Sequence, residues 1–236
     1  MKIVAYNGSP KGKNSVTHLM LKEILKGAKT AGAETTLCTL AEKTIEHCKG
    51  CFHCWYVEKN TCVIKDDMTE VISHFDNMDV LLLATPLYFD NMSGMLKVFL
   101  DRCVAYGSYF IEKDKHGESK HIDSFKEKNN KPAPKIVVVS NCGFGEHSQF
   151  RALEFMMDRM ARNMSTEVIA KILRSQGPLL QFKNEHLNPI IISYKSLLQQ
   201  AGTQLVTQGK ISKDLQKNLE QPLIPVDIYN EHINNR

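Results

Sequence analysis

Short apolar runs alternate with segments of helical periodicity along this chain, and that alternation restricts the fold more than any other feature. Apolar residues recur at helical spacing in residues 15–31, 93–103, 149–163 and Asn188–Gln208. The apolar runs that we expect to be strands are Lys2–Asn7, 35–40, 79–84, 135–140 and 166–172. A continuous apolar run is typical of a strand covered on both faces, as in a parallel sheet. The pattern predicts an α/β fold with a doubly wound five-stranded parallel sheet in three layers.

The composition is that of an ordinary globular chain, and it excludes several functional classes. With 236 residues, 42% hydrophobic and 24% charged, the chain can bury a core without disulfides or a structural metal. Lys and Arg exceed Asp and Glu by only 30 to 26 and form no basic patch, which argues against a nucleic-acid partner. No apolar run approaches the roughly 20 residues that span a bilayer, and the N-terminus does not resemble a secretion signal. The seven cysteines therefore favour a cytoplasmic protein over a disulfide framework.

Two segments interrupt the alternation and set the expected domain boundaries. Residues 1–208 are predicted to form one domain, in which the polar, Lys-rich residues 109–134 are an insertion. The insertion is either a solvated excursion or a segment that reaches a neighbouring subunit. Residues 209–236 are predicted to be a C-terminal tail. The centre of this tail, between Pro222 and Pro225, is apolar and could dock on the body or on a partner subunit. The alternative is a loose tail.

The loop after the first predicted strand has the residues of a phosphate site. In doubly wound sheets, ligands bind at the carboxyl ends of the strands. Residues 8–17 combine glycines, hydroxyl groups and Lys11 ahead of a helix. Glycine allows close approach of a phosphate, and the start of a helix offers free N–H groups. The loop matches neither the Walker A pattern nor the dinucleotide glycine pattern, and it also fits an ordinary turn with Ser15 as N-cap.

Two further loops follow strands at the same expected edge of the sheet. Residues 85–94 carry the adjacent aromatics Tyr88 and Phe89, which suit either one wall of a flat-ring pocket or the core. Residues 141–147 contain two glycines, which suit a tight turn that presents backbone amides. The three loops together indicate one ligand site.

These motifs make the chain similar to the flavodoxin-like NAD(P)H-dependent FMN reductases, particularly the branch that includes the iron–sulfur flavoproteins. The resemblance runs over about residues 2–175. Its motifs are Gly8-Ser9-Pro10-Lys11 with Ser15 and Thr17, Pro86-Leu87-Tyr88, Leu96-Lys97-x-Phe99-x-Asp101-Arg102 and Cys142-Gly143-Phe144. It implies a flavodoxin-like fold that binds FMN without a covalent bond.

The resemblance also implies which residues bind the cofactor. Those implied to hold the FMN phosphate are Ser9, Lys11, Ser15, Val16 and Thr17. Those implied to border the isoalloxazine ring are Pro86, Leu87, Tyr88, Phe89, Asn91 and Met92 on one side and Cys142, Gly143 and Phe144 on the other. The family often has Arg where Lys11 stands and Asn where Val16 stands. Lys lacks the bidentate fork of Arg, so we expect weaker phosphate binding at a site that is retained.

Four of the seven cysteines follow the spacing Cys48-x2-Cys51-x2-Cys54-x7-Cys62. Thiolate-rich sites select iron–sulfur clusters, zinc or copper(I). The spacing resembles the compact motif of iron–sulfur flavoproteins, which implies a [4Fe-4S] cluster held by these four residues beside FMN. The alternatives are free thiols at the flavin pocket or a subunit interface, a redox disulfide, or zinc completed by His47 or His53.

Three other groups of polar residues have expected roles. Asp66 and Asp67 precede an apolar stretch of helical spacing, which favours an N-cap. Asp101 and Arg102 are expected to form an ion pair at a helix end. His147 lies near the third loop, where it could approach the flavin edge.

The resemblance implies that hydride from NAD(P)H reduces FMN, which then passes electrons to a small-molecule acceptor. The acceptor is expected to be a quinone, a free flavin, an azo or nitro compound, or iron. No catalytic residue is assigned, because hydride delivery to a flavin requires no protein acid or base. The alternative is an iron–sulfur electron carrier that relays electrons between FMN and a ferredoxin-like partner, and a third hypothesis is a flavin-binding regulatory protein. Relatives imply a homodimer or homotetramer.

Overall fold

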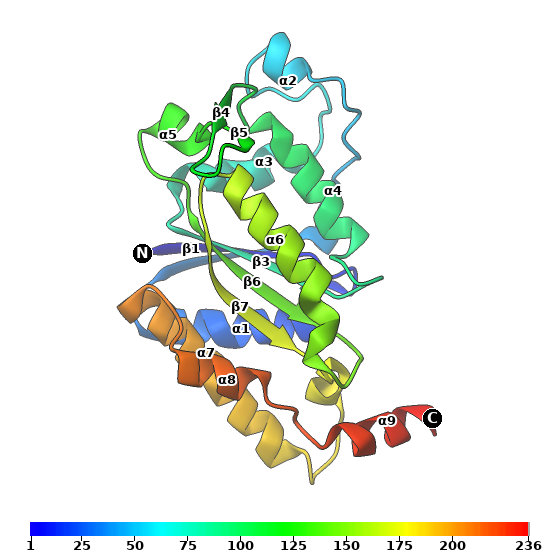
Figure 1. Ribbon diagram of the computed structural model, residues 1–236. Coiled ribbons are helices and arrows are strands. Elements are labelled where there is room, and N and C mark those ends of the chain that lie inside the picture. Colours follow the sequence, from blue (N-terminus) through cyan, green and yellow to red (C-terminus); the bar gives the residue numbers. More distant parts are fainter. Residues whose placement is uncertain (236) are drawn as a thin grey trace.

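The computed structural model describes residues 1–235, and its centre is a sheet of five parallel strands (Figure 1). In the order β2-β1-β3-β6-β7, the strands are Glu34–Thr39, Lys2–Asn7, Val80–Pro86, Lys135–Asn141 and Val168–Arg174. Every residue of β3 is buried, in agreement with its continuous apolar sequence. This strand order is the doubly wound arrangement of flavodoxin-like folds. The predicted fold class and the five strands are confirmed, each strand end within two residues of its expected position.

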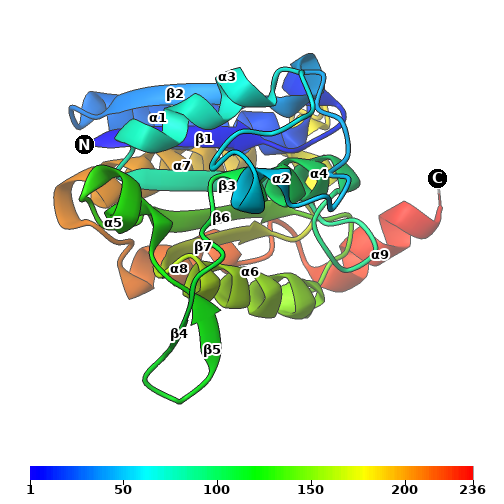
Figure 2. The same cartoon turned by 90° about the horizontal axis from the view of Figure 1, so that it is seen from above.

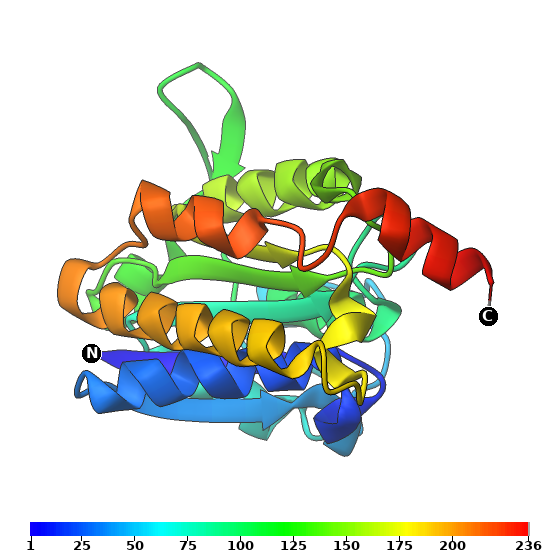
Figure 3. The same cartoon turned by 90° about the horizontal axis from the view of Figure 1, so that it is seen from below.

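One face of the sheet is covered by α1 (Val16–Thr30) and α7 (Asn188–Gln208), which lie side by side (Figure 3). Glycines allow this close packing. A Cβ atom on Gly27 would lie 1.9 Å from the carbonyl oxygen of Gln199, and one on Gly202 would lie 1.9 Å from that of Ile24. Any larger residue at either glycine would push the two helices apart.

The other face is covered by α3 (Met68–Ser73), α4 (Gly94–Arg102) and α6 (Arg151–Asn163). Aromatic side chains fill this half of the core. The ring of Tyr6 stacks on that of Phe99 with centroids 4.5 Å apart, and Phe75 meets both rings edge-on. The sheet therefore has one aliphatic face and one aromatic face.

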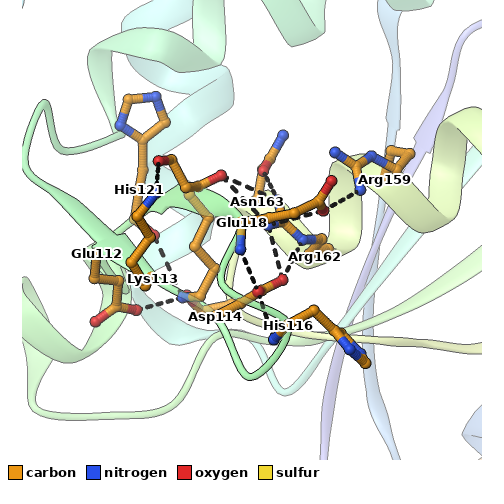
Figure 4. Close-up of polar contacts among 12 residues, drawn as sticks. Glu112, Lys113, Asp114, His116, Glu118, His121, Arg159, Arg162 and Asn163 are labelled. Atoms are coloured by element: carbon orange, nitrogen blue, oxygen red, sulfur yellow. Dashed lines mark hydrogen bonds and ion pairs between the residues drawn. The ribbon is translucent and has the colours of Figure 1, made fainter.

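The segment predicted as an insertion forms an antiparallel hairpin, β4 (Ile111–Lys113) and β5 (Ser119–His121), followed by α5 (Ser124–Asn129). Figure 2 shows the hairpin standing out from the body beside α6. Ion pairs join the two elements, Asp114 with Arg162 and Glu118 with Arg159, each at 2.8 Å (Figure 4). Partial desolvation opposes ionisation of Asp114, but hydrogen bonds from a backbone N–H and from Arg162 hold its pKa at about 2.

The residues expected to be a tail form two helices, α8 (Lys213–Glu220) and α9 (Val226–Asn234). α8 packs on α7 and β7 through the buried residues Leu215 and Leu219. Tyr229 of α9 is also buried. Within residues 1–235, this segment is therefore docked on the body of the same chain.

The remaining helical elements are short. α2 is His53–Tyr56, and single 3-10 turns are Gly12–Asn14, Leu40–Glu42, His74–Asn77, Cys103–Ala105, His147–Phe150 and Gly177–Gln181. None of the helices described between residues 1 and 235 is both long enough and apolar enough to cross a lipid bilayer.

Candidate functional site

The three predicted ligand loops meet at the carboxyl edge of the sheet, after β1, β3 and β6. Hydrogen bonds join them to one another. The Ser93 hydroxyl donates to the carbonyl oxygen of Gly8 at 2.5 Å, and the backbone N–H of Leu87 donates to that of Asn141 at 2.8 Å. The Asn141 amide then donates to the Thr17 hydroxyl at 2.8 Å. The residues predicted for one cofactor are thus brought to one edge by separate elements.

The first loop presents the start of α1 as a site for an anion. Ser15 is the N-cap, because its hydroxyl accepts from the His18 N–H at 3.0 Å and donates to the Gly12 carbonyl at 2.7 Å. In the described part of the chain, no acceptor pairs with the N–H groups of Val16 and Thr17. These two donors lie at the positive end of the helix dipole, where an anion is stabilised.

Other residues of the first loop complete this arrangement. Lys11 is exposed and has no ion-pair partner among residues 1–235. Ser9 is buried, and its hydroxyl accepts only a long 3.4 Å contact from the Lys11 N–H, so its proton is available. Gly12 has φ +52°, a left-handed conformation that favours glycine. The donor set therefore fits a phosphate.

The second loop is a tight turn that carries an aromatic ring at its tip. The backbones of Tyr88 and Asn91 exchange hydrogen bonds of 2.9 and 3.1 Å, and the residues between them, Phe89 and Asp90, have φ of +51° and +59°. The left-handed conformation costs an L-residue roughly 1–2 kcal/mol. Phe89 is fully exposed and Tyr88 is 45% exposed. The core alternative for this aromatic pair is therefore excluded, whereas Met92 and Pro86 beside it are buried.

The third loop is open on one side and held from behind. Gly143 and Phe144 are exposed, and a Cβ atom on Gly143 would meet no atom within 4 Å. Cys142 is buried, and burial raises the pKa of its thiol to about 11. His147 lies 3.9 Å from Glu220 of α8. The exposed part of the third loop therefore lies at the same edge of the sheet as the exposed turn of the second loop.

The four closely spaced cysteines line a cavity of about 740 Å³ between the Cys48–Cys62 segment, α4 and α6, and Met92 of the second loop also lines it. Cys48 and Cys51 are exposed, Cys62 is half-buried and Cys54 is buried. Burial raises the pKa of the Cys54 thiol, and the other three nearby thiols raise it further. Yet nowhere between residues 1 and 235 do three His, Cys, Asp or Glu side chains converge as metal ligands require. The four thiols therefore share one cavity without meeting at a single point in the described residues.

Comparisons with known proteins identify the family. The family model described as NADPH-dependent FMN reductase matches residues 1–173. The chain belongs to this family. Its fold is shared with solved structures of low sequence identity. An FMN-dependent NADH-azoreductase from Bacillus anthracis, solved in complex with FMN, has a TM-score of 0.61 at 13% identity and covers 87% of this chain and 99% of its own. An NAD(P)H:quinone oxidoreductase from Methanothermobacter marburgensis also scores 0.61, at 14% identity, over 87% of this chain and 96% of its own.

The curated proteins that resemble this chain in sequence are named iron–sulfur flavoproteins. One from Archaeoglobus fulgidus is 34% identical over 119 residues, which are 50% of this chain and 53% of the relative. One from Methanocaldococcus jannaschii is 34% identical over 102 residues, 43% of this chain and 51% of the relative. The chain thus spans about half the length of the curated relatives it matches.

One buried ion pair of this FMN reductase family member was not expected from its sequence. Arg102 is 1% exposed, and its Nη1 lies 2.5 Å from the Asp66 carboxylate. The expected Asp101–Arg102 pair is wrong, because Asp101 binds Lys97 one helical turn away at 2.6 Å. No local pattern links two residues 36 positions apart.

Asp67 occupies the N-cap position of α3 without a side-chain bond to the helix, and Asp66 binds the first helical N–H instead. Its carboxylate accepts from the Met68 N–H at 3.1 Å, whereas the Asp67 carboxylate accepts from the Thr44 N–H. Burial opposes ionisation of Asp66, but Arg102 and backbone N–H groups overcome it and lower its pKa. Arg102 in addition places Nη2 3.5 Å from the sulfur of Cys62, so it ties the cysteine segment to α4.

Proposed function

We propose that this chain is an FMN-dependent oxidoreductase that passes electrons from NAD(P)H through bound FMN to a small-molecule acceptor. The observation that carries the proposal is the pairing, at one edge of the sheet, of an anion site with an exposed aromatic turn. The unpartnered N–H groups of Val16 and Thr17 suit a phosphate. The exposed rings of Tyr88 and Phe89 suit a flat heterocycle. Flavin mononucleotide carries both groups, and the family match favours it over other nucleotides.

The phosphate is assigned to the first loop. The N–H groups of Val16 and Thr17 donate to it, Lys11 supplies the positive charge, and the Ser9 hydroxyl adds a donor. The Ser15 hydroxyl already donates to the Gly12 carbonyl and accepts from the His18 N–H, so its role is to fix the start of the helix. We assign it to positioning, not to direct contact.

The ring is assigned to the second and third loops. Pro86, Leu87 and Met92 form the part of the second loop that packs on the body, and Tyr88, Phe89 and Asn91 form its exposed turn. Cys142, Gly143 and Phe144 border the ring on the opposite side. When bound, FMN supplies the two-electron acceptor for hydride from the nicotinamide, and the protein orients the two rings. The high pKa of Cys142 keeps that thiol protonated near the ring at neutral pH.

The electron donor and acceptor are assigned by class. The family description supports NADPH as donor. The names of the neighbouring structures, an azoreductase and a quinone oxidoreductase, support an azo compound or a quinone as acceptor, and free flavin, nitro compounds and iron belong to the same class of reaction.

The first test is an absorption spectrum of the protein purified without oxygen, with flavin and iron assayed on the same sample. Stoichiometric flavin that NADPH or NADH bleaches rapidly without any partner protein supports a reductase. Protein that binds no flavin after FMN is added would refute the proposal. Tyr88→Ala should then raise the FMN dissociation constant and slow reduction, and an unchanged constant would remove the second loop from the site.

The second candidate is an electron carrier with a [4Fe-4S] cluster at Cys48, Cys51, Cys54 and Cys62, serving a ferredoxin-like partner. It is favoured by the shared cavity of the four thiols and by the names of the curated relatives. It is disfavoured by the failure of these side chains to converge within residues 1–235. About four irons per chain in the anaerobic sample would establish the cluster, and negligible iron would exclude it.

We further propose that the chain forms a homodimer or homotetramer. Apolar side chains gather on the surface near the cysteine cavity, where Tyr56 and Val57 are 70% and 74% exposed and the ring of Tyr109 lies 5.5 Å from that of Tyr56. Exposed apolar patches of this kind mark interaction sites. Tyr56→Glu should shift the molar mass in light scattering toward that of one chain. A wild-type mass of one chain would refute the assembly.

A further inference from the structure

The segment that follows the matched family region folds back onto the candidate cofactor site. Two side chains at its start hold it there. Arg174 is fully buried, and its guanidinium donates to the carbonyl oxygen of Gln221 at 2.7 Å. The Gln176 side-chain oxygen accepts from the N–H groups of Leu223 and Ile224 at 2.9 and 3.1 Å, and its amide donates to the Ile224 carbonyl at 2.9 Å. These bonds fix the chain between α8 and α9 at the carboxyl end of β7.

From this anchor α9 reaches the third loop. Tyr229 is 1% exposed, and its hydroxyl donates to the carbonyl oxygen of Gly143 at 2.7 Å. In a trans peptide the carbonyl and the following N–H point in opposite directions, so this bond sets the orientation of the Gly143–Phe144 peptide. Gly143 has the backbone freedom of glycine and no neighbour within 4 Å of a Cβ position. The N–H groups of Gly177 and Gln176 hold the carbonyl oxygens of Cys142 and Phe144 at 2.8 and 2.7 Å, and the Tyr229 hydroxyl adds the restraint on the carbonyl between them.

The fit between α9 and the loop also depends on the next glycine. A Cβ atom on Gly145 would lie 2.7 Å from Cγ1 of Val226, at the start of α9. The same Cβ would lie 3.6 Å from the Val226 Cβ, which is an ordinary contact. Glycine at position 145 thus admits α9 against the loop, because a larger residue would clash with a methyl group of Val226 and would also approach Asn230 Oδ1 to 3.3 Å.

We propose that α9 is a positioning element of the cofactor site, in which Tyr229 orders the third loop before the flavin ring binds. This inference rests on the proposed function, since it takes Cys142, Gly143 and Phe144 as one border of the ring. A loop held in its bound conformation raises affinity because less conformational freedom is lost on binding. Tyr229 lies outside residues 1–173, the region that the family model matches.

Tyr229→Phe tests the restraint, since it removes the hydroxyl and keeps the ring. Because a hydrogen bond contributes about 1 kcal/mol, we expect the FMN dissociation constant to rise about fivefold. Hydrogen exchange of the amides of residues 143–145 should quicken in the protein freed of flavin. The matched control is Tyr106→Phe, which removes another largely buried tyrosine hydroxyl, one that donates to Asp76 at 2.9 Å. The control should leave both readouts unchanged.

Gly145→Ala tests the same contact by pushing α9 away. It should raise the FMN dissociation constant, and the double variant Gly145→Ala/Val226→Ala should restore most of the affinity by removing the clashing methyl group. Failure of Val226→Ala to rescue would place the effect within the loop and overturn the inference.

Two results separate the inference from the function on which it rests. Wild-type protein that binds no FMN would refute the proposed function. Wild-type protein that binds FMN, with Tyr229→Phe binding it equally well and exchanging at the wild-type rate, would refute the role of α9 alone.

Discussion

Replacement of Phe89 by glycine should make the protein more stable and a poorer flavin binder. The residue has φ +51°, and its side chain is fully exposed. Relief of the left-handed conformation gains about 1–2 kcal/mol. The greater freedom of glycine in the unfolded chain offsets roughly 0.5–1 kcal/mol of that gain. Because the ring is fully exposed, its removal forfeits no burial. We therefore expect the free energy of unfolding to rise by up to about 1.5 kcal/mol.

The same substitution removes one aromatic ring from the proposed flavin wall. An aromatic pair contributes about 0.5–1.5 kcal/mol, so the FMN dissociation constant should rise about two- to tenfold. Urea unfolding of the flavin-free protein measures the first effect, and titration of flavin fluorescence measures the second. Phe155→Ala is the matched control for binding, because Phe155 is 69% exposed on α6, away from the three loops.

Two outcomes would refute the reasoning separately. A less stable Phe89→Gly protein would show that the turn is not strained by its left-handed residues. Unchanged FMN affinity would show that the exposed ring serves something other than the flavin. A single substitution is expected to raise the free energy of unfolding and weaken FMN binding only if the wild-type turn gives up stability to expose the binding ring.

Three further predictions follow from the buried charge and the thiols. Arg102→Met should lower the free energy of unfolding by about 3–5 kcal/mol in urea, because it leaves the Asp66 carboxylate buried without its partner. Lys97→Met, which breaks an exposed pair, should cost less than about 1 kcal/mol, and equal losses would contradict the burial argument. The lowered pKa of Asp66 means that its contribution is complete above the pKa of the unfolded chain and is lost as pH falls through the lower folded value. Urea midpoints measured from pH 6 to pH 2 should therefore fall more steeply for the wild type than for Asp66→Asn, and parallel slopes would be inconsistent with this pairing. In native protein, Ellman's reagent should label Cys48 and Cys51 first and Cys54 only on unfolding, since burial raises the pKa of Cys54; equally rapid labelling of Cys54 would show that the segment is open.

Periodicity was sufficient to predict the sheet, because each strand and helix carries its own apolar pattern. Residues 80–86 are buried on both faces, and residues 80–84 are apolar throughout. Capping by Ser15 was one of two readings of the first loop, and its side chain does cap α1. These features depend on neighbouring residues in the chain, which is why the sequence reveals them.

Interactions between distant residues could not be predicted in the same way. Arg102 follows Asp101 in the sequence, yet it pairs with Asp66, which lies just before α3. The fold buries the Arg102 guanidinium and leaves Asp101 exposed, where it pairs with Lys97. The docking of residues 213–234 likewise depends on Arg174 and Gln176, whose polar side chains carry no periodic signal. Cysteine spacing placed four thiols near one another, and they do line one cavity, but spacing alone could not decide between a cluster, zinc and free thiols.

Two unfavourable features lie together at the carboxyl edge of the sheet. Phe89 and Asp90 hold left-handed conformations there, and the N–H groups of Val16 and Thr17 lack partners within residues 1–235. A phosphate would satisfy the N–H groups, and a flat ring would cover the exposed aromatic side chains, so one ligand would compensate both. Because such a ligand binds only the folded state, FMN at a hundred times its dissociation constant should stabilise the protein by about 2.7 kcal/mol. Inorganic phosphate would fill only the first site and bind more weakly, so at the same free concentration as FMN it should stabilise the protein less.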